Sequence, residues 1–338
     1  MRATPLRSLF AGLLLAACMT ASPVCAEVSE VRISKGYGIL YLPLIVMEDR
    51  KFLEKKAAEA GLGDIKVTWY LFDGGNIIND AMLAGTLDIA GTGAPGFLTL
   101  WSKAKGNARA EVIGVSGMST TALVLNTTNP EVKSLKDFSP KDRIAMPGIK
   151  TSLAAVVLQM AVAKELGPEN YAKLDPLTVG IPHPEAYAAL TSGKTEIDAH
   201  FASPPYATLE LQNPRVHTVV NSVKLFGNIT LDVVFAPKRF ADANPKTIET
   251  FLAAFDEACD FIAKDPRGAA DSFARGLKTK ISPDEVLPMV QDRDTQFSST
   301  PNSIMTFANF LAGTGAMKQK AASWTDLFVP QLHGRKGS

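Results

Sequence analysis

Segments with the pattern of β-strands alternate with segments of helical pattern along most of this 338-residue chain. Residues 31–34, 65–69 and 87–90 have the alternating or apolar character of strands. Helical patterns lie between and after them, from Pro43 towards Lys56, over 77–84, and again from Pro95. This strand–helix order predicts a mostly parallel sheet with helices on its faces, that is, an α/β fold.

A second set of the same elements begins after Asn126. It contains a strand at 143–146, a helix that begins near Thr151 or Ser152 and ends at Gly167, a helix at 184–193 and a strand at 197–201. The order of elements over 81–95 is echoed over 189–204. Beyond Val234 the strand signal fades, and prolines at 245, 266, 283 and 301 stand at plausible first positions of helices. Since the length is about twice that of a common domain, we expect two units and a helical tail.

Residues 1–26 are typical of a secretory signal peptide. Two arginines precede the apolar run 9–17, which is too short to cross a bilayer as a stable helix. Cleavage after Ala26 would release a free protein, and we favour it. A competing lipobox at 15–18 would instead leave Cys18 lipidated. Either route exports the mature chain, which predicts a bacterial periplasm or cell surface.

The charge balance and the motifs exclude several classes of protein. Lys and Arg total 35 against 34 for Asp and Glu, so the formal net charge is +1 and no bulk cationic surface favours nucleic acid. The glycine-rich turns lack the spacing of phosphate and dinucleotide loops. No tight His/Cys cluster, Gly-x-Ser-x-Gly or His-Glu-x-x-His motif is present. Cleavage after Ala26 leaves Cys259 as the only cysteine, and its helical setting predicts a core residue. We therefore expect no cofactor, no metal and no catalytic residue.

Candidate binding residues of the first unit lie in loops beside the strands, since ligands of open α/β sheets bind at the carboxyl ends of strands. They are Gly36, Tyr37, Gly38, Gly74, Gly75, Asn76, Thr92 and Gly93. The glycines around Tyr37 would let the backbone approach a ligand, and the Tyr37 ring could stack on it or donate a hydrogen bond. The glycine loops that precede helices would offer backbone N–H groups to an anion or carboxylate. Ordinary turns and caps explain the same residues without a ligand.

Candidate binding residues of the second unit and of the return crossing are Lys150, Thr151, Ser152, His183, His200, Ser203 and Asp232. A helix start with two hydroxyls and a nearby ammonium suits a small anion. The two histidines could bind a ligand or be structural, and Asp232 could bind a ligand amine or cap a turn. No paired arginines stand in these loops, which favours an organic monoanion with an apolar part over bare nitrate.

The chain resembles the substrate-binding proteins of the nitrate, sulfonate and taurine ABC importers, a group related to thiamine-precursor binders. The resemblance rests on the export signal and on the order of six segments: 36–38, 43–52, 83–90, 135–138, 189–198 and 323–328. It covers most of the mature chain and does not extend to the identity of the substrate.

The resemblance implies a type II periplasmic-binding-protein fold, with two lobes, a double crossover hinge and a ligand cleft. Lobe one would hold 27–118 and 233–338, and lobe two 119–232. The protein would capture a small organic anion (a sulfonate, a taurine-like compound or a related carboxylate or nitrogenous compound) by closure of the lobes. It would act as a monomer and deliver the ligand to a membrane permease with ATPase subunits. The alternative is an enzyme on the same scaffold, similar to a desulfinase or a pyrimidine-forming enzyme.

Overall fold

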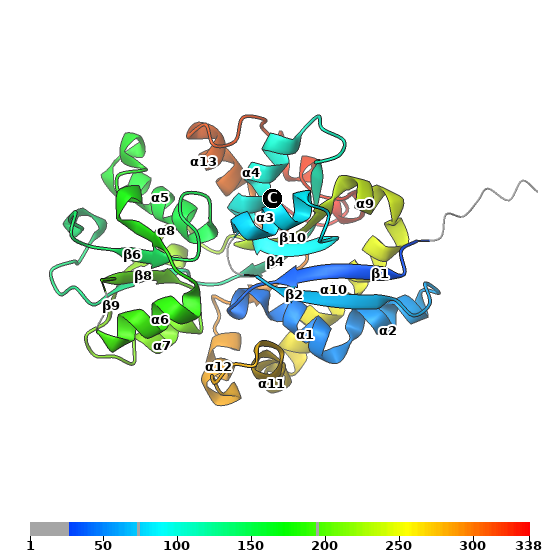
Figure 1. Ribbon diagram of the computed structural model, residues 1–338, viewed down its shortest axis with the longest axis horizontal. Coiled ribbons are helices and arrows are strands. Elements are labelled where there is room, and N and C mark those ends of the chain that lie inside the picture. Colours follow the sequence, from blue (N-terminus) through cyan, green and yellow to red (C-terminus); the bar gives the residue numbers. More distant parts are fainter. Residues whose placement is uncertain (1–26, 73–74, 194–195) are drawn as a thin grey trace, which may run out of the picture.

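The computed structural model describes residues 27–72, 75–193 and 196–338. The predicted signal peptide, both processing sites and Gly74 lie outside these residues. The described chain forms two mixed sheets, each covered by helices, arranged side by side (Figure 1). Among its helices, none is long and apolar enough to span a membrane.

Within the described residues, eleven strands make up the two sheets. The first sheet has the order β11-β4-β10-β3-β1-β2 and the second the order β7-β6-β8-β5-β9. The strands are β1 Glu30–Lys35, β2 Lys66–Leu71, β3 Ile89–Gly93, β4 Val112–Thr120, β5 Val124–Thr127, β6 Ile144–Met146, β7 Thr178–Gly180, β8 Ala199–Ala202, β9 His217–Asn221, β10 Asp232–Pro237 and β11 Gln296–Phe297.

Helices cover both sheets. In Figure 1, α1, α2, α10 and α11 lie on one side of the first sheet and α3, α4 and α13 on the other, while α5 to α8 surround the second sheet. The helices are α1 Leu42–Arg50, α2 Phe52–Glu59, α3 Gly75–Leu83, α4 Ala94–Ala104, α5 Leu153–Leu166, α6 His183–Ser192, α7 Tyr206–Glu210, α8 Ser222–Phe226, α9 Lys238–Ala243, α10 Pro245–Lys264, α11 Pro266–Leu277, α12 Pro283–Val290 and α13 Met305–Gly313.

The prediction of a mostly parallel sheet is wrong in part. β1 runs parallel to β2 and β3, and β6 runs parallel to β7 and β8. The pairs β10–β3, β10–β4, β11–β4, β5–β8 and β5–β9 are antiparallel. The antiparallel strands β4, β5, β9 and β10 are those on either side of the chain's passage between the sheets. The local pattern of residues in a strand does not reveal whether the strand will run parallel or antiparallel to its neighbours in the sheet.

The chain passes between the sheets twice, from β4 to β5 and from β9 back to β10. Apart from β11, the two sheets have the same strand arrangement, with β3 beside β1 and β8 beside β6. The strands of the echoed segments, β3 and β8, therefore occupy equivalent places in the two sheets. The exact lobe boundaries stay a prediction.

Individual helix predictions need small corrections. The helix expected from Pro43 towards Lys56 is two helices, because Lys51 adopts a left-handed conformation at φ 56° and ends α1. Pro245, Pro266 and Pro283 do begin helices, and Ser282 caps α12. Pro301 does not, since α13 starts at Met305.

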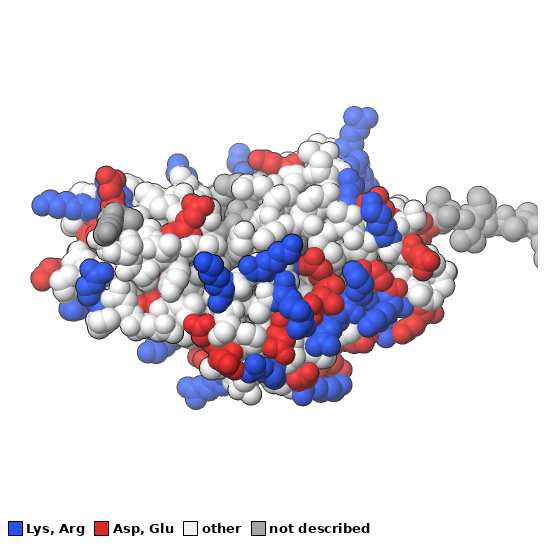
Figure 2. All heavy atoms as spheres, turned by 60° about the horizontal axis from the view of Figure 1, so that its bottom comes forward, with Lys and Arg blue, Asp and Glu red and all other residues white. Residues whose placement is uncertain are grey.

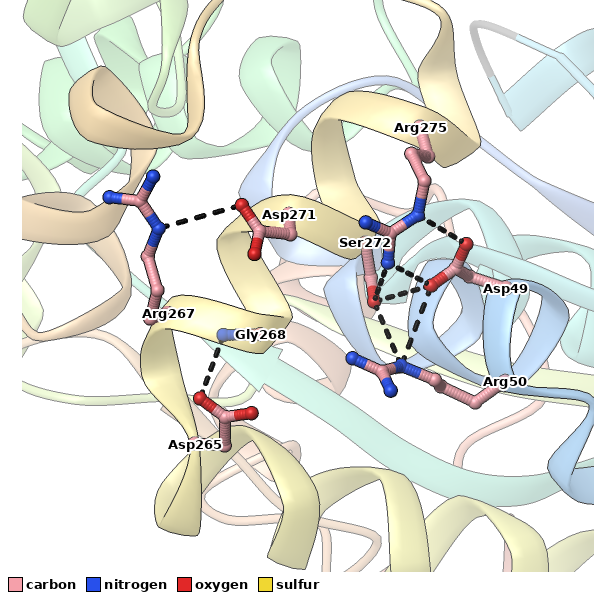
Figure 3. A network of polar contacts seen from close by, with 8 residues as sticks. All are labelled: Asp49, Arg50, Asp265, Arg267, Gly268, Asp271, Ser272 and Arg275. Atoms are coloured by element: carbon pink, nitrogen blue, oxygen red, sulfur yellow. Dashed lines mark hydrogen bonds and ion pairs between the residues drawn. The ribbon is translucent and has the colours of Figure 1, made fainter.

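The helical tail completes the first sheet's side of the molecule. Arg275 of α11 donates to both carboxylate oxygens of Asp49 in α1, at 3.0 and 2.7 Å, and the Ser272 hydroxyl donates to the same carboxylate at 2.6 Å (Figure 3). The contact ties residues 226 positions apart along the chain. Figure 2 shows that charged side chains gather on this side with both signs mixed, so this face presents no extended patch of one sign.

Candidate functional site

A cavity of about 60 Å³ lies where the two sheets face each other. Its lining residues come from both sides: Tyr37, Leu40, Tyr41, Gly93, Leu123, Pro147, Ser152, Leu153, Ala154, His183, Ser203 and Asp232. None of these described lining residues is Lys or Arg. A volume of this size holds several water molecules or a small organic group.

The two sides of the cavity touch at its rim. The Ile39 N–H donates to the carbonyl oxygen of Pro204 at 2.9 Å. Gly38 has a φ of 95°, and a Cβ atom added there would lie 3.1 Å from the Ser203 hydroxyl oxygen. A Cβ atom added at Gly93 would lie 2.7 Å from the Cβ atom of Leu153. A side chain at Gly38 is therefore opposed by the positive φ, and one at Gly93 by the close approach of Leu153.

Six of the predicted binding residues line the cavity: Tyr37, Gly93, Ser152, His183, Ser203 and Asp232. Other predicted residues lie elsewhere. Gly36 packs beneath the Tyr41 ring. Thr92 belongs to β3 instead of a loop and is fully buried. Gly75 and Asn76 form the start of α3. Contact of the six with a ligand stays a prediction.

The helix start at 150–152 is only partly in the cavity. Lys150 is exposed, with a φ of 67°, and Thr151 lines a separate surface hollow beside α3 and α4. The Ser152 hydroxyl accepts the Ala155 N–H at 3.2 Å and donates to the Gly148 carbonyl oxygen. Its oxygen thus caps α5, and its hydrogen is committed to the Gly148 carbonyl oxygen. The first turn of α5 lies at the cavity, and the N–H groups of this turn have no acceptor within the helix.

Asp232 stands at the start of β10, opposite Gly93 and Ser119 in the register. Its side chain is 1% exposed. The Tyr41 hydroxyl donates to the carboxyl group, but among the described residues Oδ2 has no hydrogen-bond partner. Burial raises the pKa of Asp232 to about 7, and the Tyr41 hydrogen bond opposes this rise. The group can therefore exist as an acid or as a carboxylate near neutral pH.

His183 begins a chain of buried polar contacts. Its Nδ1 lies 2.8 Å from Nε2 of His200, and Nδ1 of His200 lies 2.5 Å from Oε1 of Glu210. His200 and Glu210 are fully buried and His183 is nearly so. Tyr206 stacks on the His183 ring. Burial, followed by the proximity of His200, lowers the pKa of His183 well below its ordinary value. Both predicted histidines thus belong to one network, of which only His183 reaches the cavity.

Sequence reasoning missed several residues of the site. Tyr41, Leu123 and Pro147 line the cavity, and Glu210 lies behind the histidines. Tyr41 follows closely on the loop after the first strand, so its place in the sequence could have identified it as a candidate cavity residue. Glu210 carries no such signal, because a carboxylate at the end of a short helix is usually exposed.

Within residues 27–72, 75–193 and 196–338, no group of three or more His, Cys, Asp or Glu is placed to hold a metal ion. The profile of the NMT1-like family matches residues 26–278, three quarters of the chain and all of the cavity. The chain belongs to the NMT1-like family. No curated protein sequence matches it significantly.

This NMT1-like protein has the fold of periplasmic binding proteins. The alkanesulfonate-binding protein SsuA from Xanthomonas axonopodis pv. citri, bound to MOPS, superposes with a TM-score of 0.69 and 19% identity, over 87% of this chain and 96% of that one. The nitrate-binding protein NrtA from Synechocystis PCC 6803 gives 0.68 and 14%, over 89% and 84%. The aliphatic sulphonate binding protein SsuA from Escherichia coli gives 0.65 and 18%, over 92% and 96%.

Proposed function

We propose that this NMT1-like protein is the periplasmic substrate-binding component of an ABC importer and captures a small organic ligand in the cavity between its sheets. The observation that carries the proposal is the buried Asp232 carboxyl group, which stands in a cavity wall with one oxygen unpartnered among the described residues. A polar atom left unpaired in the interior is costly unless a ligand or water satisfies it. The family, the fold and the similarity to sulfonate- and nitrate-binding proteins support a binding role.

The polarity of the cavity suggests how such a ligand would lie. The first turn of α5 offers backbone N–H groups and the positive end of a helix dipole, which favour the anionic group of a sulfonate or carboxylate. Asp232 would accept an N–H or O–H from the ligand. Because no Lys or Arg stands among the described lining residues, a ligand carrying both an anionic group and a donor is favoured over a dianion.

The cellular setting follows the same proposal. An exported chain of this family would meet its ligand outside the cytoplasmic membrane, as a monomer. It would pass the ligand to a permease driven by ATPase subunits. Passing the ligand to the permease would require the two lobes to move relative to each other. The two crossings of the chain between the sheets would act as the hinge.

The alternative function is an enzyme on the same scaffold. Cys259, the nucleophile such an enzyme would need if the signal is cleaved at Ala26, lies in α10 and not among the cavity residues. A desulfinase-like or pyrimidine-forming activity would consume its ligand, whereas a receptor returns it unchanged. Analysis of ligand recovered after prolonged incubation separates the two functions, and turnover that is lost on replacing Cys259 would establish the enzyme.

A thermal-shift screen followed by calorimetry tests the proposed function. The panel would contain ethanesulfonate, taurine, nitrate, aromatic carboxylates and aminopyrimidines, since a ligand that binds only the folded state raises the unfolding temperature. A hit should lose affinity on Asp232→Asn but not on Asp242→Asn, a matched change at the exposed α9. Equal affinity in both variants would place the ligand outside this cavity.

A further inference from the structure

A groove that shares no lining residue with the ligand cavity lies between the two sides of the molecule. It encloses about 520 Å³, against about 60 Å³ for the cavity. Residues of α7, from the second sheet's side, line one wall, and residues of α12, from the tail, line the other; both helices stand in the lower part of Figure 1. A space of several hundred Å³ between two units of a protein has the size and the place of a binding site for a small molecule.

The walls of this groove are largely aliphatic. Val124 of β5 and Leu209 of α7 face Pro288 and Met289 of α12 across it. Leu211, just after α7, also lines the groove and is 47% exposed, although leucine of this size is normally covered. No aromatic residue stands among the described lining residues. An aliphatic ligand would bury apolar surface on both walls at once, which is favourable in water.

The charged residues that line the groove are both acidic. They are Glu285 and Asp292, and no Lys or Arg stands among the described lining residues. Their spacing of seven positions places them on the same face of α12 and its continuation. Ser282 donates its N–H and its hydroxyl to Oε2 of Glu285, at 2.8 and 2.9 Å, and these hydrogen bonds lower the pKa of Glu285, so it is ionised at neutral pH. The nearby Arg267 pairs with Asp284 outside the groove.

We propose that the groove between α7 and α12 is a second binding site, which takes an amphipathic organic cation, that is, an ammonium group on an aliphatic chain. The chain would lie against Leu209, Leu211 and Met289, and the ammonium group would lie at the Glu285 and Asp292 carboxylates. Aliphatic walls and unbalanced negative charge are complementary to this class of ligand and to neither an anion nor a neutral apolar compound. The site goes beyond the proposed function, because its residues are separate from those of the ligand cavity.

The chain that crosses between the sheets separates the groove from the ligand cavity. Ala122 and Val124 line the groove, whereas Leu123 between them lines the cavity. In the same way Pro204 lines the groove and Ser203 the cavity. Successive side chains of an extended chain point to opposite sides, so the two spaces lie back to back across these segments.

This position couples the groove to the arrangement of the two sides. The walls of the groove belong to different sides, so a movement of one side relative to the other changes the distance between them. In the arrangement described here, Pro204 of the groove wall also accepts the Ile39 N–H at the cavity rim, at 2.9 Å. A cation that fits the groove as it stands binds this arrangement better than others and stabilises it. By linkage, the cation and a ligand of the closed cavity raise each other's affinity.

Titration with hexyltrimethylammonium tests the site, because its charge does not depend on pH. The ¹³C-methyl signal of Met289, assigned through Met289→Leu, should move and saturate. Glu285→Gln with Asp292→Asn removes both charges but keeps an acceptor oxygen for the Ser282 cap and for the Asp294 N–H. This double variant should weaken binding about tenfold. Asp242→Asn with Asp260→Asn changes the net charge equally at exposed pairs elsewhere and should leave the affinity unchanged.

Two further measurements separate charge from shape. 1-Hexanol carries the same chain without the charge and should bind about tenfold more weakly than the cation. Thr208→Trp places a large ring at an exposed position of the α7 wall, so it should fill the groove and abolish the Met289 response. A Met289 signal that does not move, or equal affinities in the two double variants, would overturn the site. Equal binding of 1-hexanol would overturn the assignment to cations.

Calorimetry of the best cavity ligand of the panel, with and without saturating hexyltrimethylammonium, tests the coupling. We expect the cation to tighten binding at least about fivefold in the unmodified protein and to have no effect in Thr208→Trp. Unchanged affinity in the unmodified protein would overturn the coupling. If no compound of the panel binds the cavity but Met289 responds as stated, the second site stands and the proposed function is wrong.

Discussion

At the residue scale, Asp232 combines a proposed role in ligand binding with a cost to stability above neutral pH. A carboxyl group buried without a cation favours its protonated form, which is why the pKa of Asp232 is raised to about 7 from its ordinary value of 3.8. Between these two values the folded protein holds a proton that the unfolded chain releases. The contribution of Asp232 to stability is therefore fully present below about pH 4 and is lost as pH rises through 7.

Asp232→Asn removes this titration. We expect the variant to gain stability relative to the unmodified protein as pH rises, by about 2–4 kcal/mol between pH 4 and pH 8, while it binds ligand more weakly. Urea unfolding of both proteins at several pH values measures the difference, and Asp242→Asn serves as the exposed control. A difference in unfolding free energy that does not vary with pH would show that Asp232 is ionised in the folded protein.

Cys259 illustrates a residue whose setting suppresses its chemistry. It packs partly buried against the main core from α10. Burial, followed by the nearby Asp256 and Asp260 carboxylates, raises the pKa of the thiol. Since the thiolate is the reactive form, we expect alkylation near neutral pH to be much slower in the native protein than in urea. Timed labelling with iodoacetamide measures this, and equal rates in both conditions would contradict it.

At the scale of elements, polar contacts decide how the tail helices attach. The Arg275 hydrogen bonds, followed by those of Ser272, lower the pKa of Asp49 despite its partial burial. A depressed pKa means that the stabilisation is present above about pH 4 and is lost as pH falls through the folded-state value. Arg275 is 55% exposed, so solvent screens part of this contact.

Asp49→Asn should therefore lower the free energy of unfolding by about 1 kcal/mol at pH 7, and the difference should shrink towards pH 3. Urea unfolding at both pH values measures it. Asp260→Asn, which breaks only an exposed pair with Lys264 one turn along α10, should have a smaller effect. An Asp49→Asn effect that persists unchanged at low pH would mean that packing, and not charge, joins α11 to α1.

At the scale of the whole molecule, Gly38 and Gly93 lie where the two sides of the cavity approach each other closely. Gly93 ends β3 with a φ of −58°, a conformation that alanine also adopts, so only the contact with Leu153 across the cavity opposes a side chain there. The position therefore tests closure without disturbing the backbone.

Gly93→Ala should hold the two sides apart and raise the dissociation constant of the best ligand of the panel about tenfold or more, given the cost of overpacking. Calorimetry gives the affinity, and small-angle scattering should show less compaction on ligand addition. Adding Leu153→Gly should restore binding. Gly180→Ala, with no atom within 4 Å of the new methyl group, is the matched control. Unchanged affinity in Gly93→Ala would show that ligand binding does not depend on the close approach of Gly93 and Leu153.

Residue patterns along the chain predict the α/β class, the strands β1, β2, β3, β6 and β8 with the helices beside them, and six of the residues that line the cavity. These features are local, since side-chain periodicity, prolines and glycines act within a few residues. Three features emerge only from the folded chain: β4, β5, β9 and β10 pair antiparallel, Ser152 uses its hydroxyl to cap α5, and Glu210 lies behind His200. Such facts depend on which segments meet in space, and the energy of a buried charge or a close backbone contact is fixed by neighbours that are distant along the chain.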